Sequence, residues 1–488
     1  MSKPSDNALA RGIAFRCLAI LLPLLLLLLT ELGLKLFGWK PPSDDYDPFV
    51  EVQGGSLFEL NESGSTYQIR ESRLKFFRPQ SFVREKPKNG IRIFCLGGST
   101  VQGRPYSVET AFPAWLELSL KTLYPNRQWE VINCGGVSYA SYRLNPIIDE
   151  CLRYQADLIV ICTGHNEFLE DRTYEQLKRW PKPVIGLASL FTSSRVAALV
   201  RVGLSGIVSI DGDRSRSVLE EDVDALLDYK NGLDRYHYNP DWRKAIEKHF
   251  HLSVEAMAEK ASAAEVPMVL ICPPSNLRDT LPFKSEFNPE TPSETRSRIT
   301  DLVLEAGRIG DPFGKVDSLR RAVELDPVFA LAHFRLGQAL LKVGRVDEAK
   351  SELSLARDWD VCSLRILSSM ETSLKDLGRN PGVRFIDGNE TLETHYDMPI
   401  LGGPVLVDHV HPGIEAHFQL ALRLLPVVLK EQDYVLSEPD KKRLTALFGD
   451  RMKTLEPAYF VQGQKRLNAL RRWTQSDHDD QERDRSEP

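Results

Sequence analysis

The sequence predicts an α/β protein whose core is a five-stranded parallel sheet sandwiched between helices. Three observations support this prediction: short apolar segments recur along the chain, turn residues follow each segment, and helical periodicity follows most of the turns. Short apolar segments that alternate with helices are typical of parallel strands buried on both faces. The 488 residues, of which 42% are hydrophobic, are ample for such a core.

The predicted strands lie at uneven intervals, because insertions separate the later ones. The five strands are expected at Ile91–Leu96, Glu130–Asn133, Asp157–Cys162, Pro267–Cys272 and Val383–Ile386. A helix is expected over Trp242–Ala264, just before the fourth strand. Three of the seven cysteines lie in these strands, where cysteine acts as a small apolar residue. There is no CxxC pair, so a zinc or redox site has little support.

Two insertions interrupt the alternation, at residues 171–238 and 301–360. In the second, small residues such as Ala332, Gly337 and Ala349 alternate with large ones and resemble a tetratricopeptide repeat. Such small residues allow two helices to approach closely. The segment Ala322–Pro327 resembles the end of a preceding repeat. A plain helical hairpin is the alternative interpretation.

The segment 17–39 is predicted to be a transmembrane helix that anchors the chain. It contains only two charged residues, Glu31 and Lys35, and it is long enough to span a bilayer. A cleaved signal peptide is the alternative, but no small-x-small cleavage site follows. Basic residues precede the segment and acidic residues follow it, which places residues 1–16 in the cytoplasm and the rest outside it. We therefore expect a single-pass signal-anchor protein of the cell membrane or periplasm.

The remaining boundaries follow from composition. We expect a linker and pre-domain segment at 40–89, the α/β domain at 90–430 and a helical segment at 431–473. Residues 474–488 hold no aliphatic or aromatic side chain, which predicts a disordered tail. The formal net charge of −6 does not suggest a nucleic-acid partner.

The first candidate catalytic residue is Ser99, which follows the first predicted strand and two glycines. Ligands of parallel sheets bind beyond the carboxyl ends of the strands, and Ser99 falls there. The motif is not the GxSxG nucleophile elbow, because residue 101 is valine. A helix cap or a glycine-rich phosphate loop is the alternative. On its own this motif is weak.

Polar and glycine residues also follow the second and third strands. Gly135 and Gly136 let the backbone approach a ligand, so that an N–H group of one of them faces a developing oxyanion. Asn166 offers an amide donor after the third strand, next to Glu167. Ordinary strand-to-helix turns remain an alternative for both segments.

The segment Val407–Gly413, beyond the last strand, is the most informative. A serine needs a base to become nucleophilic, and histidine has a suitable pKa. Asp408 lies three residues before His411, so that one loop supplies both the base and its orienting carboxylate. A metal site formed by Asp408, His409 and His411 is the competing interpretation, but the sequence offers no obvious further ligands.

Taken together, these segments resemble the SGNH (GDSL-like) hydrolases, a family named for its Ser, Gly, Asn and His blocks. The resemblance covers about residues 90–170 and 265–425, and it departs from the family at Gly98, where aspartate is usual. It implies a three-layer, flavodoxin-like α/β/α fold. It also implies that no metal or organic cofactor is needed.

The resemblance assigns roles to individual residues. Ser99 would be the nucleophile, His411 the general base and Asp408 the residue that holds the imidazole tautomer. The N–H groups of Ser99 and Gly135, with the Asn166 side chain, would form the oxyanion hole. We prefer Gly135 to Gly136 because it follows Asn133 in an Asn-x-Gly pattern.

Two further residues are candidates for substrate binding. Asn276 and Arg278 follow the fourth strand, so that they are placed to line a pocket. A proline-stiffened connection with a surface arginine is the alternative.

Three functional hypotheses follow. The first is a membrane-anchored serine esterase that removes acyl groups, including acetyl groups from carbohydrate. The second is an O-acyltransferase acting on a polysaccharide. The third is a tethered interaction protein, whose tetratricopeptide-like insertion binds a protein partner while the hydrolase-like core is inert.

Overall fold

The structure is a computed structural model that describes residues 56–170, 227, 232–430 and 435–475. The predicted transmembrane segment, residues 17–39, and most of the 171–238 insertion lie outside the described residues. Among the residues that are described, no helix is both long and apolar enough to cross a membrane.

The core is a five-stranded parallel sheet, as the sequence predicts. Its strands run in the order β5-β4-β6-β7-β8, the arrangement of flavodoxin-like doubly wound sheets. The strands are β4 (Gly90–Gly97), β5 (Gln128–Gly135), β6 (Leu158–Cys162), β7 (Met268–Cys272) and β8 (Val383–Asp387). Gly97 pairs in register with Gly135 on one side and with Cys162 on the other. The carboxyl ends of β5, β4 and β6 therefore meet at one edge of the sheet, where the functional side chains follow.

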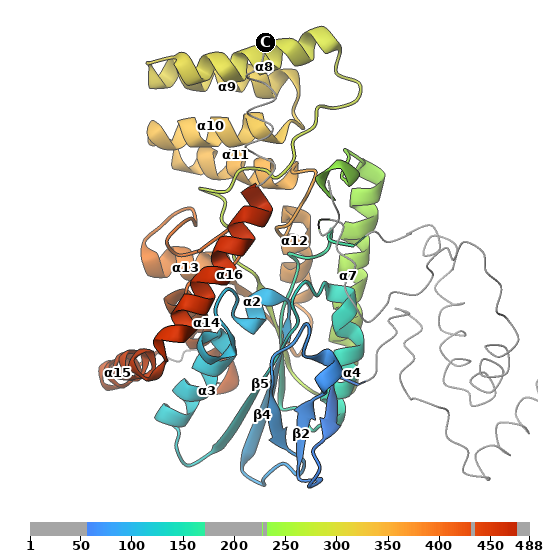
Figure 1. Ribbon diagram of the computed structural model, residues 1–488, viewed down its shortest axis with the longest axis vertical. Coiled ribbons are helices and arrows are strands. Elements are labelled where there is room, and N and C mark those ends of the chain that lie inside the picture. The colour runs from blue at the N-terminus through green and yellow to red at the C-terminus, as the bar shows by residue number, and fades with distance from the viewer. Residues whose placement is uncertain (1–55, 171–226, 228–231, 431–434, 476–488) are drawn as a thin grey trace, which may run out of the picture. The chain divides into compact units, whose positions relative to one another are not determined.

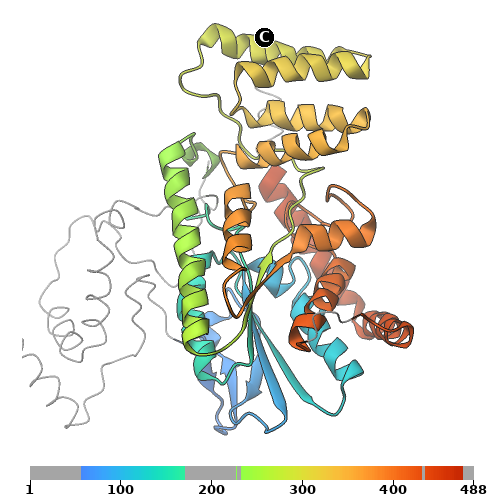
Figure 2. The same ribbon diagram turned by 180° about the vertical axis from the view of Figure 1, so that it is seen from behind.

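Helices cover both faces of the sheet, which completes three layers (Figures 1 and 2). One face carries α3 (Phe112–Leu123), α13 (Gly388–Tyr396), α14 (Ile414–Val428) and α15 (Glu438–Thr454). The other carries α4 (Asn145–Arg153), α7 (Pro240–Ala263) and α12 (Ser368–Leu377). The predicted helix at 242–264 is confirmed as α7. Cys95, Cys162 and Cys272 are buried in their strands with free thiols, as expected from their apolar surroundings.

The segment before the main sheet is more ordered than predicted. Within the expected linker, 40–89, the chain forms a small antiparallel sheet of β1 (Phe58–Leu60), β2 (Thr66–Ile69) and β3 (Ser81–Val83). Phe58 and Phe82 pack edge to face against Phe94 of β4. The alternating pattern around the Asn-Glu-Ser-Gly turn of residues 61–64 is the signal that could have identified this hairpin.

The insertion between β7 and β8 is helical. It contains two antiparallel pairs, and its helices are α8 (Ser293–Arg308), α9 (Pro312–Leu325), α10 (Ala330–Lys342) and α11 (Val346–Asp358). A β-carbon on Gly337 would lie 2.6 Å from Cγ of Leu353, which explains the small residue between α10 and α11. Arg278, after β7, accepts a hydrogen bond at its carbonyl from Gln338, which ties the insertion to the α/β layer.

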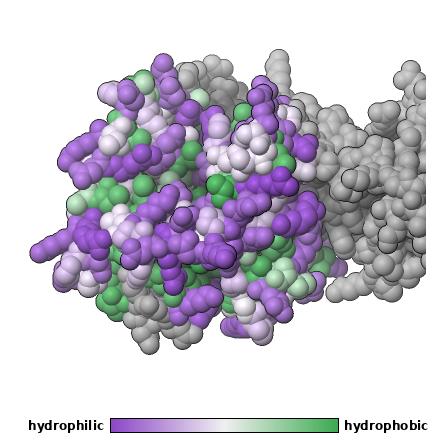
Figure 3. All heavy atoms as spheres, turned by 90° about the horizontal axis from the view of Figure 1, so that it is seen from below, coloured by the Kyte–Doolittle hydropathy of each residue, from purple (hydrophilic) through white to green (hydrophobic). Residues whose placement is uncertain are grey.

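The described part of the chain ends with α15 and α16 (Pro457–Gln475), in the segment expected to be helical. Helix α16 extends two residues into the predicted tail, and residues 476–488 lie outside the described part. Hydrophilic side chains cover most of the face seen in Figure 3, with apolar side chains between them in small groups. Most large apolar side chains of the described residues are packed in the core, but a few, such as Leu304 and Phe313, are exposed.

Candidate active site

Ser99 begins the short helix α2 (Ser99–Gln102), directly beyond β4. Gly97 ends the strand where a β-carbon would lie 2.1 Å from the carbonyl oxygen of Cys162, so that only glycine fits. Asn133 holds the turn from the neighbouring strand, because its Nδ2 atom donates to the carbonyl of Val101 at 2.7 Å. The turn that presents Ser99 is thus fixed from both sides. The sequence analysis did not assign this positioning role to Asn133.

Ser99, His411 and Asp408 form one hydrogen-bonded chain. The Oγ atom of Ser99 lies 2.8 Å from Nε2 of His411. Nδ1 of the same ring lies 2.7 Å from Oδ2 of Asp408. The imidazole therefore has an acceptor for a proton on Nδ1 and presents Nε2 to the hydroxyl. This is the geometry in which histidine can accept the proton of a nucleophilic serine.

The loop that carries Asp408 and His411 is closed by its own hydrogen bonds. Oδ1 of Asp408 accepts from the N–H groups of Val410 and His411 at 2.9 and 2.8 Å. The Val407 N–H donates to the carbonyl of His411 at 2.9 Å. The carboxylate is therefore held on both oxygens, one by the backbone and one by the imidazole.

Electrostatics favour an ionised Asp408. Burial alone would raise the pKa of this carboxyl, but the charge and hydrogen bond of His411, the charge of His409 and a backbone N–H outweigh it. The pKa is held well below its usual range. Burial lowers the pKa of His409 to about 4, against the opposing pull of Asp408. At neutral pH the loop therefore contains a fixed negative charge beside the His411 ring and a neutral His409.

Asn166 lies at the same edge of the sheet, after β6. Its Nδ2 atom donates to the carbonyl of Tyr139 at 2.9 Å, and an amide NH₂ group has a second hydrogen to offer. Glu167 follows Asn166 directly in the chain. Its buried carboxylate accepts from the backbone N–H and the hydroxyl of Ser141 at 2.7 and 2.9 Å.

The Gly135 N–H, predicted to contribute to an oxyanion hole, is already engaged in a hydrogen bond within the protein. The Gly135 N–H donates to Oδ1 of Asn133 at 2.9 Å, and the alternative donor, the Gly136 N–H, donates to the carbonyl of Gly97 at 2.9 Å. The Gly136 N–H thus ties the end of β5 to β4, and the Gly135 N–H is used within β5 itself. The Asn-x-Gly pattern that favoured Gly135 therefore marks a structural side-chain-to-backbone bond.

Ser138 is the nearest following residue whose backbone N–H has no partner among the described residues. It has a left-handed φ of 63°, uncommon for a residue other than glycine, asparagine or aspartate. Its neighbour Tyr139 carries the carbonyl that accepts from Asn166. Backbone strain of this kind clusters at functional sites. The strain at Ser138 depends on the backbone angle φ, which a sequence motif does not reveal.

Asn276 and Arg278, predicted to bind substrate, instead hold loops together. Asn276 is 5% exposed, its Nδ2 donates to the carbonyl of Asp408 at 3.2 Å, and its N–H donates to the carbonyl of His409 at 2.9 Å. Arg278 donates to the carbonyl of Gly403 at 2.6 Å and pairs with Asp279. The predicted position beyond β7 was right, but the groups are already bonded within the protein.

The competing metal interpretation finds no support in the described part of the chain. There, no group of three or more histidine, cysteine, aspartate or glutamate side chains is arranged to hold a metal ion. Asp408 and His411 are instead bonded to each other and to Ser99.

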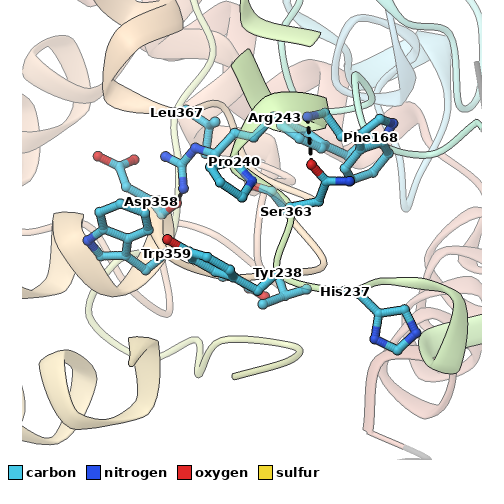
Figure 4. A pocket seen from close by; sticks show the side chains of 13 residues that line it. Phe168, His237, Tyr238, Pro240, Arg243, Asp358, Trp359, Ser363 and Leu367 are labelled. Carbon is cyan, nitrogen blue, oxygen red and sulfur yellow. Dashed lines mark hydrogen bonds between the residues drawn. The ribbon is translucent and has the colours of Figure 1, made fainter. Parts of the chain in front are cut away.

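A separate pocket lies where the start of α7 meets the connection from α11 to α12 (Figure 4). Its wall includes the aromatic side chains of Phe168, Tyr238, Trp242 and Trp359. The guanidinium of Arg243 lies 4.9 Å from the ring centre of Trp359. Phe168 lies two residues after Asn166 in the sequence. The pocket therefore includes a residue of the segment that follows β6.

Comparison with known proteins gives distant structural likenesses only. No family model and no curated protein matches the chain. A variant of an acetyl xylan esterase from Geobacillus stearothermophilus matches with 12% identity and a TM-score of 0.32, over 73% of this chain and 100% of that one. An α/β hydrolase from the metagenome of Lake Arreo, Spain, matches with 12% identity and a TM-score of 0.31, over 72% and 99%.

A gut microbial diltiazem-metabolizing enzyme matches with 12% identity and a TM-score of 0.30, over 72% of this chain and 48% of that one. Likenesses at this distance carry no argument about the chemistry of this chain.

Proposed function

We propose that the chain is a serine esterase of the SGNH type that works through an acyl-serine intermediate. The observation that carries the proposal is the hydrogen-bonded chain from Ser99 Oγ through His411 to Asp408, with distances of 2.8 and 2.7 Å. The order of the motif blocks along the sequence supports it independently.

In the first half-reaction, His411 removes the proton of Ser99 as its oxygen attacks the ester carbonyl. Asp408 keeps the imidazole in the required tautomer and stabilises the imidazolium that forms. His411 then gives the proton to the leaving alcohol. In the second half-reaction a water molecule attacks the acyl-serine with the same assistance, which releases the acid and restores the serine.

The developing oxyanion needs hydrogen-bond donors. We assign this role to the N–H groups of Ser99 and Ser138 and to the second amide hydrogen of Asn166, with Ser138 in place of the glycine expected from the sequence. Removing one such donor in other serine hydrolases typically costs about 3 kcal/mol of barrier stabilisation.

The location and the substrate are further parts of the proposal. We propose that residues 17–39 anchor the chain in the membrane with the catalytic domain outside the cytoplasm, and that the insertion at 301–360 is a tetratricopeptide-like surface for a protein partner. A carbohydrate ester is the proposed substrate class.

The test is ester hydrolysis by the full chain with aryl esters from acetyl to long acyl. We expect turnover of one range of chain lengths, lost in both Ser99→Ala and His411→Ala. His395→Ala is the matched control, because His395 lies exposed on α13 and contacts none of the three residues. Turnover that is unchanged in Ser99→Ala would show that the mechanism is wrong.

An O-acyltransferase is the second candidate. It would use the same acyl-serine and a carbohydrate hydroxyl in place of water. It is favoured if the acyl group appears on an added glycan faster than as free acid.

The third candidate, an inert core that only recruits a partner, is tested by deleting residues 301–360. Loss of a co-purifying partner with ester hydrolysis intact would assign binding to the insertion and catalysis to the core.

A further inference from the structure

Three arginines from distant parts of the sequence lie on segments that meet around the end of α2, the short helix that begins with Ser99. Arg104 is the closest along the chain, and its backbone N–H donates to the carbonyl of Ser99 at 3.1 Å. Arg78 precedes β3, and Arg466 lies on α16 near the end of the described chain. We refer to Arg78, Arg104 and Arg466 as the arginine cluster.

Separate contacts bring each segment to this place. Gln102, at the end of α2, donates to the carbonyl of Phe76 at 2.7 Å, which fixes the segment that carries Arg78. Arg466 donates to the carbonyl of Tyr106 at 2.5 Å, and Tyr106 stacks on Tyr459 of the same helix α16. Figure 1 shows α16 passing beside α2.

The three guanidinium groups are close enough to repel one another. Burial, followed by the charges of Arg78 and Arg466, lowers the pKa of Arg104 to about 10. Burial and then the charge of Arg78 also lower the pKa of Arg466. Guanidinium groups stay protonated in proteins at neutral pH, so the cluster concentrates positive charge around the end of α2.

The three arginines of the cluster are half-buried, and they lack the carboxylate partners that balance fully buried arginines of this protein. Among the described residues, Arg78 and Arg104 form no side-chain hydrogen bond or ion pair, and the Nε atom of Arg104 is buried without a partner. Arg466 donates only to backbone carbonyls and to Gln462. Glu109 acts on Arg466 through space, but it forms no ion pair with it.

The contrast with the rest of the core is clear. Arg92, Arg143 and Arg357 are almost fully buried, and each is paired with a glutamate at 2.6 to 2.8 Å. A buried charge without a partner is costly, so proteins normally pair it. In the cluster this cost applies to the buried Nε atom of Arg104, which has no partner among the described residues, so the site is suited to an anion from outside.

We propose that the arginine cluster binds an anionic group of the substrate and so makes the protein selective for esters that carry a carboxylate or a phosphate. The planar guanidinium fork matches both anions. This inference rests on the proposed esterase function and adds the charge class of its substrate. Because Arg466 comes from α16, the C-terminal helix becomes a part of the specificity site.

The experiment compares three aryl acetates of similar size on the full chain: para-acetoxybenzoate, para-acetoxyphenyl phosphate and the neutral para-acetoxybenzamide. The readout is the ratio of kcat/KM for each anionic ester to that for the neutral one. We expect Arg104→Gln to lower this ratio about tenfold or more, as the loss of a charged hydrogen bond does. Comparing variant with wild type cancels differences between the leaving groups.

Arg379→Gln is the matched control, because this arginine lies exposed in a surface pair with Asp376 and should leave the ratio unchanged. Arg78→Gln should act in the same direction as Arg104→Gln, and it serves as the second variant if the latter does not fold. The ratio should also fall as ionic strength rises. The kcat/KM ratio that falls more in the variants, that of the carboxylate ester or that of the phosphate ester, identifies the anion that the cluster prefers.

A second measurement separates this inference from the esterase proposal. Calorimetry on Ser99→Ala should show tighter binding of the anionic esters than of the amide, and this preference should be lost in the double variant with Arg104→Gln. Such binding without any turnover by the wild type would overturn the esterase but keep the cluster. Turnover of all three esters, with a ratio unaffected by Arg78→Gln and Arg104→Gln, would overturn the cluster and keep the esterase.

Discussion

Gly98 lies directly against the side chain of Asn166, since a β-carbon at residue 98 would be 2.6 Å from Nδ2 of that asparagine. The same β-carbon would be 3.3 Å from the carbonyl oxygen of Tyr139, which accepts the Asn166 hydrogen bond. The residue before the nucleophile and the proposed oxyanion donor thus share one tightly filled space. This contact accounts for a glycine where aspartate is usual in the SGNH pattern.

Gly98→Ala should therefore lower kcat with little change in KM. The added methyl group pushes the Asn166 amide away from Tyr139, and the loss of a well-placed oxyanion donor costs about a hundredfold. Steady-state kinetics on an aryl acetate measure the effect. Gly307→Ala is the control, because a β-carbon at this position of α8 meets nothing within 4 Å. If Gly98→Ala keeps the wild-type rate, Asn166 is not part of the oxyanion hole.

Asp408→Asn should lower kcat about a thousandfold or more, because the amide no longer stabilises an imidazolium and can hold the wrong tautomer. Asparagine and aspartate are similar in size, so KM should change little. Asp397→Asn is the control, since Asp397 is exposed and has the left-handed φ of 50° that asparagine also adopts. Activity close to wild type in Asp408→Asn would show that the carboxylate has no role.

Asn276→Ala tests whether this residue positions the catalytic loop or binds substrate. Its side chain donates to the carbonyl of Asp408, so we expect kcat to fall about tenfold, as for the loss of one buried hydrogen bond. A substrate-binding role would instead raise KM and leave kcat unchanged. The split between the two constants, measured on the same aryl acetate, decides between the positioning role and the role predicted from the sequence.

His417 should make the fold sensitive to acid. Burial, and then the charge of His411, lower its pKa from 6.5 to about 3, so that the unfolded chain takes up a proton more readily than the folded one. Stability is therefore lost as the pH falls from about 6.5 towards 3. Between pH 8 and pH 5, His417 lowers the free energy of unfolding by about 2 kcal/mol.

Denaturant unfolding of His417→Gln at these two pH values measures this contribution. The free energy of unfolding of the variant should fall by about 2 kcal/mol less than that of the wild type. His395→Gln, at an exposed position, should behave as the wild type does. An identical pH dependence in His417→Gln and wild type would contradict the buried, neutral state of this ring.

Local patterns in the sequence were enough for the parallel sheet and for the position of most site residues. Each strand is a short apolar segment, and Ser99, Asn166, Asp408 and His411 directly follow strands or lie beyond the last one. Because the carboxyl ends of parallel strands share an edge, sequence order alone brings these side chains together. The antiparallel sheet of β1 to β3 was missed because its strands have only three or four residues.

Only the tertiary structure decided which polar groups remain available. Gly135 and Asn276 carry the right groups in the right segments, but their donors are used by Asn133 and by the loop carbonyls of residues 408 and 409. The arginine cluster joins residues that are up to 388 positions apart in the sequence. Hydrogen bonds and charges compete in three dimensions, so the free donor at Ser138 and the unpaired Arg104 become visible only after the chain is folded.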